Sequence, residues 1–201
     1  MRALRRAWAT LTGRRYALVD RADLMAALRK RSRGGAPFAV VLLGLDGFAA
    51  VNDMYGRDVG DAVLAQVGAK LALLAGEYRG TVAARLRGDE FALIAPSPQS
   101  VISQTWGYEA LCAVAAVVVD GLVSFQVRTS VGVVHGRPGA DPARLLHAAD
   151  TALFEAKVSG GDAVVVYDTD AELPTVDTAP PVRLRDMAAV ERAVAQGVGP
   201  A

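Results

Sequence analysis

The sequence predicts an α/β fold in which helices flank a central, largely antiparallel sheet, and three patterns support this prediction. Residues 38–45 form one continuous apolar run, which is typical of a central strand covered on both faces. Residues 81–95 contain two apolar runs joined by a polar turn, the pattern of a β-hairpin. Segments with helical apolar spacing separate these strands. With 201 residues, 52% of them hydrophobic, the chain has room for one sizeable core.

The N-terminal part is expected to be helical through residue 33. An apolar stripe supports this prediction and consists of Leu18, Leu24, Met25 and Leu28. Residues 34–37, Gly-Gly-Ala-Pro, end the helix before the strand over 38–45. A short helix is expected over residues 48–54.

A longer helix is expected over residues 58–74, with Gly76 beyond its end. Its buried face is predicted to consist of Val63, Leu64, Val67, Leu71 and Leu74. The hairpin follows, and residues 96–98, Pro-Ser-Pro, close its second strand.

Beyond the hairpin, a helix is expected over residues 99–117. Gly107 and the β-branched run at 117–119 disfavour helix at those two places. Residues 125–134 alternate between apolar and polar side chains at period two, which predicts a strand with one wetter face.

The next helix is expected to begin at Asp141 and Pro142, a cap residue followed by proline at the first helical position. Its inner side is predicted to consist of Leu145, Leu146, Ala149, Leu153 and Ala156. A last, short strand is expected over residues 164–167. Beyond it the chain is rich in proline, threonine and aspartate, which indicates a linker, and residues 184–194 are predicted to form a loose terminal helix.

These elements predict three segments along the chain. Residues 1–35 form a basic helical segment, residues 36–168 the main domain, and residues 169–201 a linker with the terminal helix. The 22 basic and 21 acidic side chains give a net charge of +1, so no general field indicates nucleic acid as a partner. Ten basic side chains fall within the first 33 residues. This cluster either favours contact with an anionic membrane or an acidic partner, or is a solvated helix face.

The single cysteine, Cys112, excludes an intrachain disulfide and a cluster of thiolate metal ligands. Its apolar neighbours predict a small buried side chain. The strongly apolar run over 110–119 is too short to span a bilayer. We therefore expect a soluble, cytoplasmic protein.

The turn of the hairpin carries two acids, Asp89 and Glu90. Two carboxylates at a strand turn can hold a cation. The alternative is that Asp89 and Glu90 are ordinary solvated turn residues, because turns favour aspartate in any case.

Several motifs extend this observation along the chain. They are Leu11-Thr12-Gly13, Leu45-Asp46-Gly47-Phe48, Val51-Asn52-Asp53-Met54-Tyr55-Gly56, Gly60-Asp61, Arg85-Leu86-Arg87-Gly88-Asp89-Glu90-Phe91, Ser130-Val131-Gly132-Val133 and Ala148-Ala149-Asp150-Thr151-Ala152-Leu153-Phe154-Glu155-Ala156-Lys157. In this order and spacing they resemble the GGDEF domains of bacterial diguanylate cyclases, over about residues 11–168. The resemblance implies a fold similar to the palm of adenylate cyclases and polymerases. With no sensor domain ahead of the motifs, we expect a small accessory protein.

The resemblance also implies an activity. Members of this family join two GTP molecules into cyclic di-GMP, and each domain of a homodimer presents one GTP to the other. Attack of a ribose hydroxyl on an α-phosphate requires cations on the triphosphate and alignment of the two substrates. By resemblance, Mg²⁺ is the cofactor, and Asp89 and Glu90 are the catalytic acids, Asp89 also binding the metal.

The remaining nucleotide-binding residues implied by the resemblance are Phe48, Asn52, Asp61, Arg87 and Lys157. By resemblance, Asn52 and Asp61 match the pair of residues that binds the guanine base. An amide and a carboxylate suit the mixed hydrogen-bond donors and acceptors of guanine. The alternative is that these two residues merely cap or terminate the adjoining helices.

The metal site departs from the family pattern. The family places a metal-binding Asp where this chain has Gly44, so the partner carboxylate of Asp89 is lost. Because Mg²⁺ requires near-ideal oxygen ligation, weak or absent binding is expected. Asp46 lies about 6–7 Å further along an extended strand, too far to replace the missing group.

Other departures from the family pattern point the same way. Ala49 replaces a lysine, Arg57 a histidine, Arg87 the first glycine of the signature and Gly161 an arginine. The inhibitory product site would fall at residues 78–81 and is absent from the sequence.

Three hypotheses follow. The first is a degenerate GGDEF domain, inactive as a cyclase, that regulates by binding a guanine nucleotide or a protein partner. The second is an active diguanylate cyclase with an unusual metal site. The third is an interaction module in which the pocket has no function and the basic N-terminus or the C-terminal tail binds a partner.

Overall fold

The computed structural model describes residues 17–119, 123–168 and 182–183. Its elements in chain order are α2 (Arg21–Arg33), β1 (Phe38–Leu45), α3 (Phe48–Tyr55), α4 (Arg57–Glu77), β2 (Val82–Arg87), β3 (Glu90–Pro96), α5 (Ser100–Val114), β4 (Ala116–Val119), β5 (Val123–Gln126), β6 (Thr129–Gly136), α6 (Pro142–Val158), β7 (Ala163–Asp168) and β8 (Val182–Arg183). The strand order of the main sheet is β2-β3-β1-β6-β7-β8, and β4 pairs separately with β5.

The main sheet is antiparallel at every pairing except the parallel pair of β6 and β7. β1 lies between β3 and β6, and all eight of its residues are buried. The predicted α/β fold with a largely antiparallel sheet and a central strand at 38–45 is confirmed.

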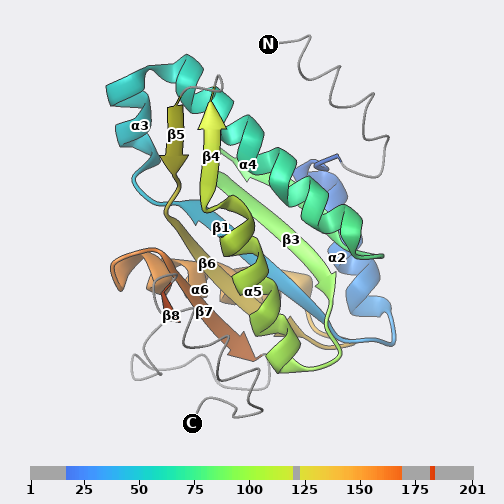
Figure 1. The fold of residues 1–201 in the computed structure, drawn as a ribbon. Helices are drawn as coiled ribbons and strands as arrows, with labels where there is room; N and C mark the ends of the chain where they lie inside the picture. Colours follow the sequence, from blue (N-terminus) through green and yellow to red (C-terminus); the bar gives the residue numbers. More distant parts are fainter. Residues whose placement is uncertain (1–16, 120–122, 169–181, 184–201) are drawn as a thin grey trace.

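Helices cover both faces of this sheet. Alternate residues of β1 point to opposite faces, so Val41 and Leu43 join the core against α4 and α5, whereas Val40 and Leu42 join the core with residues of α2 and α6. Figure 1 shows α4 and α5 in front of the sheet and α6 behind it. The strand end at Gly44 therefore faces the α6 side, in alternation with Leu42.

Two glycines allow the helices to lie close to the sheet. A β-carbon on Gly132 of β6 would collide with backbone atoms of Ala149 and Leu153 in α6. A β-carbon on Gly107 of α5 would lie 2.7 Å from side-chain carbons of Val133 and Val164. Gly107, which disfavours helix by propensity, is thus explained by packing.

The helices around β1 largely agree with the prediction. α3 and α4 form as expected, and every predicted buried residue of α4 is buried. Gly76, however, lies inside α4, which continues to Glu77. α4 is by length and hydropathy apolar enough to cross a membrane, a test that core helices also pass, and its apolar face packs in the core.

The segment after α5 differs from the prediction. α5 ends at Val114, and the β-branched run at 117–119 belongs to β4, because β5 offers it an antiparallel partner. The single strand predicted over 125–134 is divided between β5 and β6. β6 has no wetter face, because β1 and β7 flank it and α5 and α6 lie on its faces, so all eight residues are buried.

The structure tests three further predictions, and three others lie outside the described residues. Cys112 is exposed, so the prediction of a buried side chain is wrong: it lies on the outward side of α5. Leu24 and Leu28 are buried on α2 as predicted, whereas Leu18 precedes the helix and packs against the opposite core. Asp141 caps α6 as predicted. The helix before residue 17, most of the linker and the terminal helix lie outside the described residues.

Candidate functional site

The hairpin turn is fixed beside the end of β1. Gly88 has a positive φ of 50°, and Arg85 donates from Nε and Nη2 to the Gly88 carbonyl at 3.0 and 2.7 Å. The backbone N–H of Leu45 donates to the carbonyl of Asp89 at 3.3 Å. The turn and the strand end therefore form one unit that includes both acids of the hairpin.

Glu90 lies directly opposite Gly44 in the antiparallel pairing of β1 with β3. Opposed residues point to the same face, so Glu90, rather than Asp89, is the acid aligned with position 44. Its Oε2 accepts from Arg87 Nε at 2.9 Å. This hydrogen bond raises the pKa of the exposed Arg87 guanidinium. Glu90 thus already has a cationic partner within the chain.

The space above Gly44 is filled by the end of Lys157. A β-carbon on Gly44 would lie 2.7 Å from Lys157 Nζ, 2.8 Å from Lys157 Cε and 3.7 Å from Leu153 Cδ2. Lys157 comes from the last turn of α6, where the helix dipole favours a cation. The structure therefore places an ammonium group where a side chain at position 44 would begin.

Asp46 is occupied by a structural role. Its Oδ1 accepts from Ser130 Oγ at 2.8 Å, and its Oδ2 accepts from the backbone N–H of Asp162 at 2.7 Å. A β-carbon on Gly161 would lie 2.7 Å from the same Oδ2. Asp46 thus joins the end of β1 to β6 and to the turn before β7, and its carboxylate is not free to replace the one missing at Gly44.

The residues predicted to read guanine lie on α3 and α4. A β-carbon on Gly60 would collide with Asn52 Oδ1, and it would lie 3.2 Å from Cζ of Phe48. The Asn52 amide is thereby placed against the residue that precedes Asp61, whose side chain is exposed. Neither Asn52 nor Asp61 caps a helix: Gly47 and Gly56 are the N-caps of α3 and α4. The capping alternative is therefore wrong.

The site has two parts joined by the turn from β1 to α3. One part contains Phe48 and Asn52 with Asp61 beside them, and the other contains Gly44 with Glu90 and Lys157. A cavity of about 270 Å³ adjoins the second part and is lined by residues that include Arg87, Glu90 and Leu153. Asp89 is partly buried beside them, and the structure gives no side-chain contact that assigns it a role.

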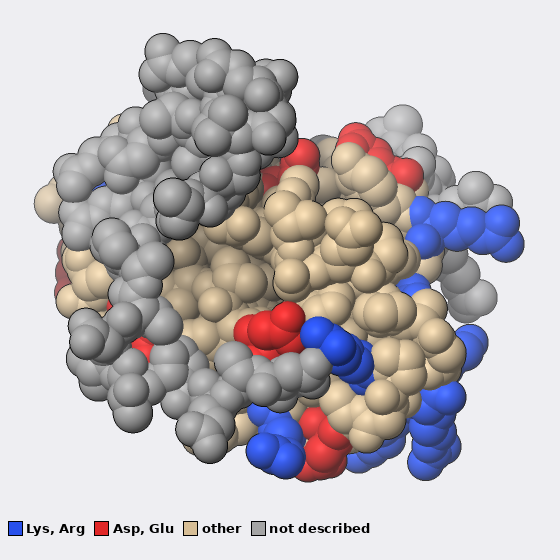
Figure 2. Space-filling model, turned by 90° about the horizontal axis from the view of Figure 1, so that it is seen from below, with Lys and Arg blue, Asp and Glu red and all other residues tan. Residues whose placement is uncertain are grey.

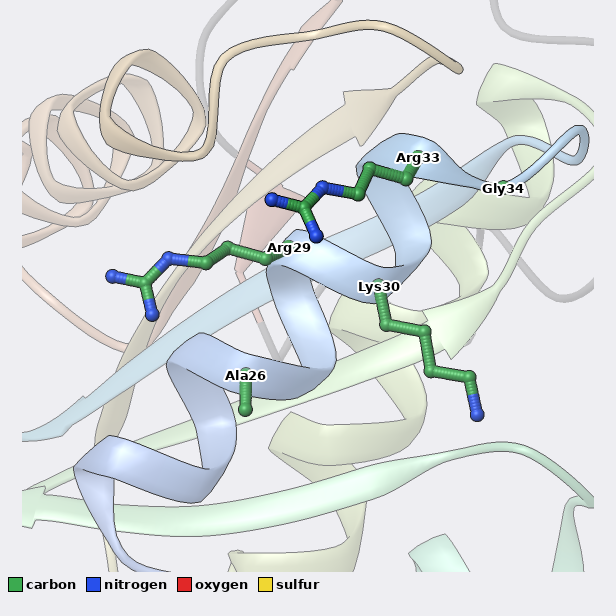
Figure 3. Close-up of a pocket in the computed structure, with 5 residues that line it drawn as sticks. All are labelled: Ala26, Arg29, Lys30, Arg33 and Gly34. Atoms are coloured by element: carbon green, nitrogen blue, oxygen red, sulfur yellow. The ribbon is translucent and has the colours of Figure 1, made fainter.

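A separate, shallow cavity of about 390 Å³ lies on the C-terminal half of α2 and contains none of these residues. Figure 3 shows that Arg29 and Arg33 extend to one side of α2 and that Lys30 extends to another. Elsewhere, acidic and basic side chains occur together on the face seen from below (Figure 2), and ion pairs such as Arg137 with Asp168, at 3.7 Å, are local.

The residues present do not fit the magnesium site that the resemblance implies. Mg²⁺ is usually held by one or two carboxylates together with substrate phosphates. Here Gly44 offers no ligand, Glu90 is paired with Arg87, and an ammonium group lies above the strand end. Within the described ranges, no three His, Cys, Asp or Glu side chains gather in a way that could hold a metal ion.

Sequence reasoning missed two relationships in this site. It treated Asp46 as a motif residue and did not identify its bonds to Ser130 and Asp162. It also did not bring Lys157 to Gly44, because the two are far apart in the chain and meet only when α6 packs on β6 and β1. The small residues Gly132 and Gly44 are the sequence signals of this close packing.

Comparison with known proteins identifies the same family as the motifs of the sequence. Residues 10–163 match the family model described as diguanylate cyclase, GGDEF domain. The biofilm architecture maintenance protein MbaA of Vibrio cholerae is 30% identical over 166 residues, which are 79% of this chain and 21% of MbaA. The response regulator PleD of Caulobacter vibrioides is 31% identical over 160 residues, 77% of this chain and 33% of PleD. The chain thus spans a third or less of the length of these two curated relatives.

Solved structures show the same similarity. The diguanylate cyclase SiaD of Pseudomonas aeruginosa, in complex with its activator SiaC, superposes with a TM-score of 0.68 and 31% identity, covering 83% of this chain and 66% of SiaD. The GGDEF domain of DgcB from Caulobacter crescentus, in complex with c-di-GMP, gives a TM-score of 0.65 and 25% identity, covering 74% and 88%.

Proposed function

The chain belongs to the GGDEF family of diguanylate cyclase domains, and from this premise we propose that it is a regulator that binds a guanine nucleotide without acting as a cyclase. The observation that carries the proposal is the ammonium of Lys157 above Gly44. A cyclase of this family needs a metal on the triphosphate, and the strand end lacks the carboxylate and instead has an ammonium group beside it.

The geometry of the other part supports nucleotide binding. Asn52 packs beside the residue that precedes Asp61, and Asp61 is exposed, so an amide and a carboxylate are available to one base edge. Phe48 packs at the same place and offers an apolar ring. These contacts do not depend on a metal, so base recognition can persist where catalysis is lost.

The alternative function is an active diguanylate cyclase that makes cyclic di-GMP from two GTP. One observation favours it: Glu90 keeps the position opposite the strand end, and the hairpin turn keeps its geometry. This activity would also require a homodimer, because each domain holds one of the two substrates.

A protein partner is part of the same proposal. SiaD was solved with an activator protein. By analogy, a degenerate domain can exert regulation through a bound protein, and nucleotide binding would then control that contact.

One experiment tests the proposed function. The purified full-length chain is incubated with GTP and Mg²⁺ or Mn²⁺, cyclic di-GMP is measured by mass spectrometry, and GTP binding is measured by calorimetry. The diguanylate cyclase SiaD with its activator SiaC, under identical conditions, is the positive control for turnover. We expect GTP binding and no product. Cyclic di-GMP at a rate similar to that of SiaD would establish the alternative, and absence of binding would leave an interaction module.

A further inference from the structure

Lys157 brings a cation to the part of the site where the family pattern requires a metal ligand. Its Nζ lies 2.7 Å, and its Cε 2.8 Å, from the position that a β-carbon on Gly44 would take. Only a glycine leaves room for the ammonium in this position. Gly44 and Lys157 are therefore complementary in shape.

Two carboxylates at the strand end, those of Glu90 and Asp46, are engaged elsewhere. Glu90 accepts from Arg87 Nε, and Asp46 accepts from Ser130 Oγ and from the Asp162 backbone N–H. Within residues 17–119 and 123–168 the structure records no ion pair or hydrogen bond of the Lys157 ammonium. The ammonium is thus available to an anion that enters from outside.

The turn after the strand end adds backbone donors at the same end of β1. α3 begins at Phe48, three residues after β1 ends at Leu45, and no side chain caps its first turn. By contrast, Asp20 and Asp141 cap α2 and α6. The N-cap Gly47 has nothing within 4 Å of the place a β-carbon would occupy, so this turn is open. Uncapped N–H groups at a helix start favour an anion such as phosphate.

We propose that this site binds the phosphates of a guanine nucleotide without a divalent metal, with the Lys157 ammonium in the role of the cation. The inference rests on the proposed function, because it takes the nucleotide from there and adds how its charge is neutralised. An ammonium is a point charge with freely rotating donors, so it does not impose the octahedral ligand geometry of Mg²⁺.

The proposal predicts that magnesium does not strengthen GTP binding. Mg²⁺ bound to GTP removes negative charge from the phosphates and brings a second cation toward the ammonium, and like charges repel. Metal-free GTP should therefore bind at least as tightly as magnesium GTP. A site that uses a metal as its cation gives the reverse order.

The test is calorimetric titration of the full-length chain with GTP, once in EDTA and once in excess Mg²⁺. Guanosine, which has no phosphate, serves as a second probe. Lys157→Met removes the ammonium and keeps an unbranched side chain. Lys30→Met is the matched control, because Lys30 also lies in the last turn of its helix and is exposed on α2 (Figure 3).

We expect GTP to bind in EDTA and Mg²⁺ to weaken binding or leave it unchanged. In EDTA, Lys157→Met should weaken GTP binding by about tenfold, the effect expected of a hydrogen bond to a charged group, and should leave guanosine binding unchanged. Lys30→Met should leave both unchanged. Binding that requires Mg²⁺ would overturn the inference and leave the proposed function intact. Equal effects of the two lysine variants would overturn it as well, and absence of GTP binding in both conditions would overturn both proposals.

Discussion

The ammonium of Lys157 lies 2.7 Å from the place where a β-carbon on Gly44 would stand, although the two residues belong to α6 and to the end of β1. Any side chain at position 44 must displace this ammonium. The displaced group is the end of a flexible side chain, so substitution is possible without moving the backbone. A single substitution at position 44 therefore tests whether the strand end can hold a metal.

Gly44→Asp should make GTP binding respond to magnesium. The new carboxylate would lie opposite Glu90, so the strand end would again offer two acids to a metal. We expect Mg²⁺ to strengthen GTP binding by about tenfold or more in this variant, by analogy with the effect of residues around a metal. Titration calorimetry with and without Mg²⁺ measures this. Gly44→Asn is the control of similar shape without the charge, and equal magnesium responses in both variants would contradict the placement of the strand end.

Asp61→Ala should weaken GTP binding by about tenfold, because a buried base edge loses a charged hydrogen-bond partner. Asp58→Ala is the matched control, since Asp58 is an exposed aspartate in the first turn of the same helix. Calorimetry with GTP and with ATP measures both affinity and base selectivity, and circular dichroism checks the fold. A loss of the same size in both variants would show that Asp61 acts only through its charge.

Gly132→Ala should destabilise the fold by about 1–3 kcal/mol, the usual cost of overpacking a core. The added methyl group would collide with backbone atoms of Ala149 and Leu153, so α6 must shift on β6. Urea unfolding followed by circular dichroism measures the loss. Gly35→Ala is the control, because nothing lies within 4 Å of its β-carbon position. Unchanged stability of Gly132→Ala would refute the close packing of helix and strand.

Asp46→Ala should reduce stability by about 2 kcal/mol, because Ser130 Oγ and the Asp162 N–H lose a charged acceptor. The same substitution should leave the magnesium dependence of GTP binding unchanged, since this carboxylate is not a metal ligand in our account. Unfolding and calorimetry on one preparation measure the two effects. A changed magnesium response with full stability would instead assign Asp46 to the metal.

Much of the fold follows from local patterns in the sequence. The apolar run of β1 and the buried face of α4 are visible because burial on a regular element repeats with its period. Tertiary pairing decided the elements that were predicted wrongly. Residues 117–119 carry β-branched side chains that suit either a helix end or a strand, and the partner β5 selects the strand. The exposure of Cys112 depends on which side of α5 meets the core.

The sequence predicted which positions belong to the candidate site, but not which of their side chains meet in space. The motifs located Asn52, Asp61, Glu90 and Lys157, but a motif does not give the register of β1 against β3, which aligns Glu90 with Gly44. The fit of Lys157 above Gly44 depends on the approach of α6 to the sheet, which Gly132 permits. Contacts between distant segments therefore define the chemistry of this site, and composition and spacing do not contain them.

A crystal structure of the full-length chain grown with GTP and excess magnesium tests the central claim most directly. Our account predicts the Lys157 ammonium in contact with the nucleotide phosphates and no magnesium ion coordinated between Glu90 and the end of β1. Magnesium ions with complete coordination at that place, and Lys157 turned away from the phosphates, would contradict it.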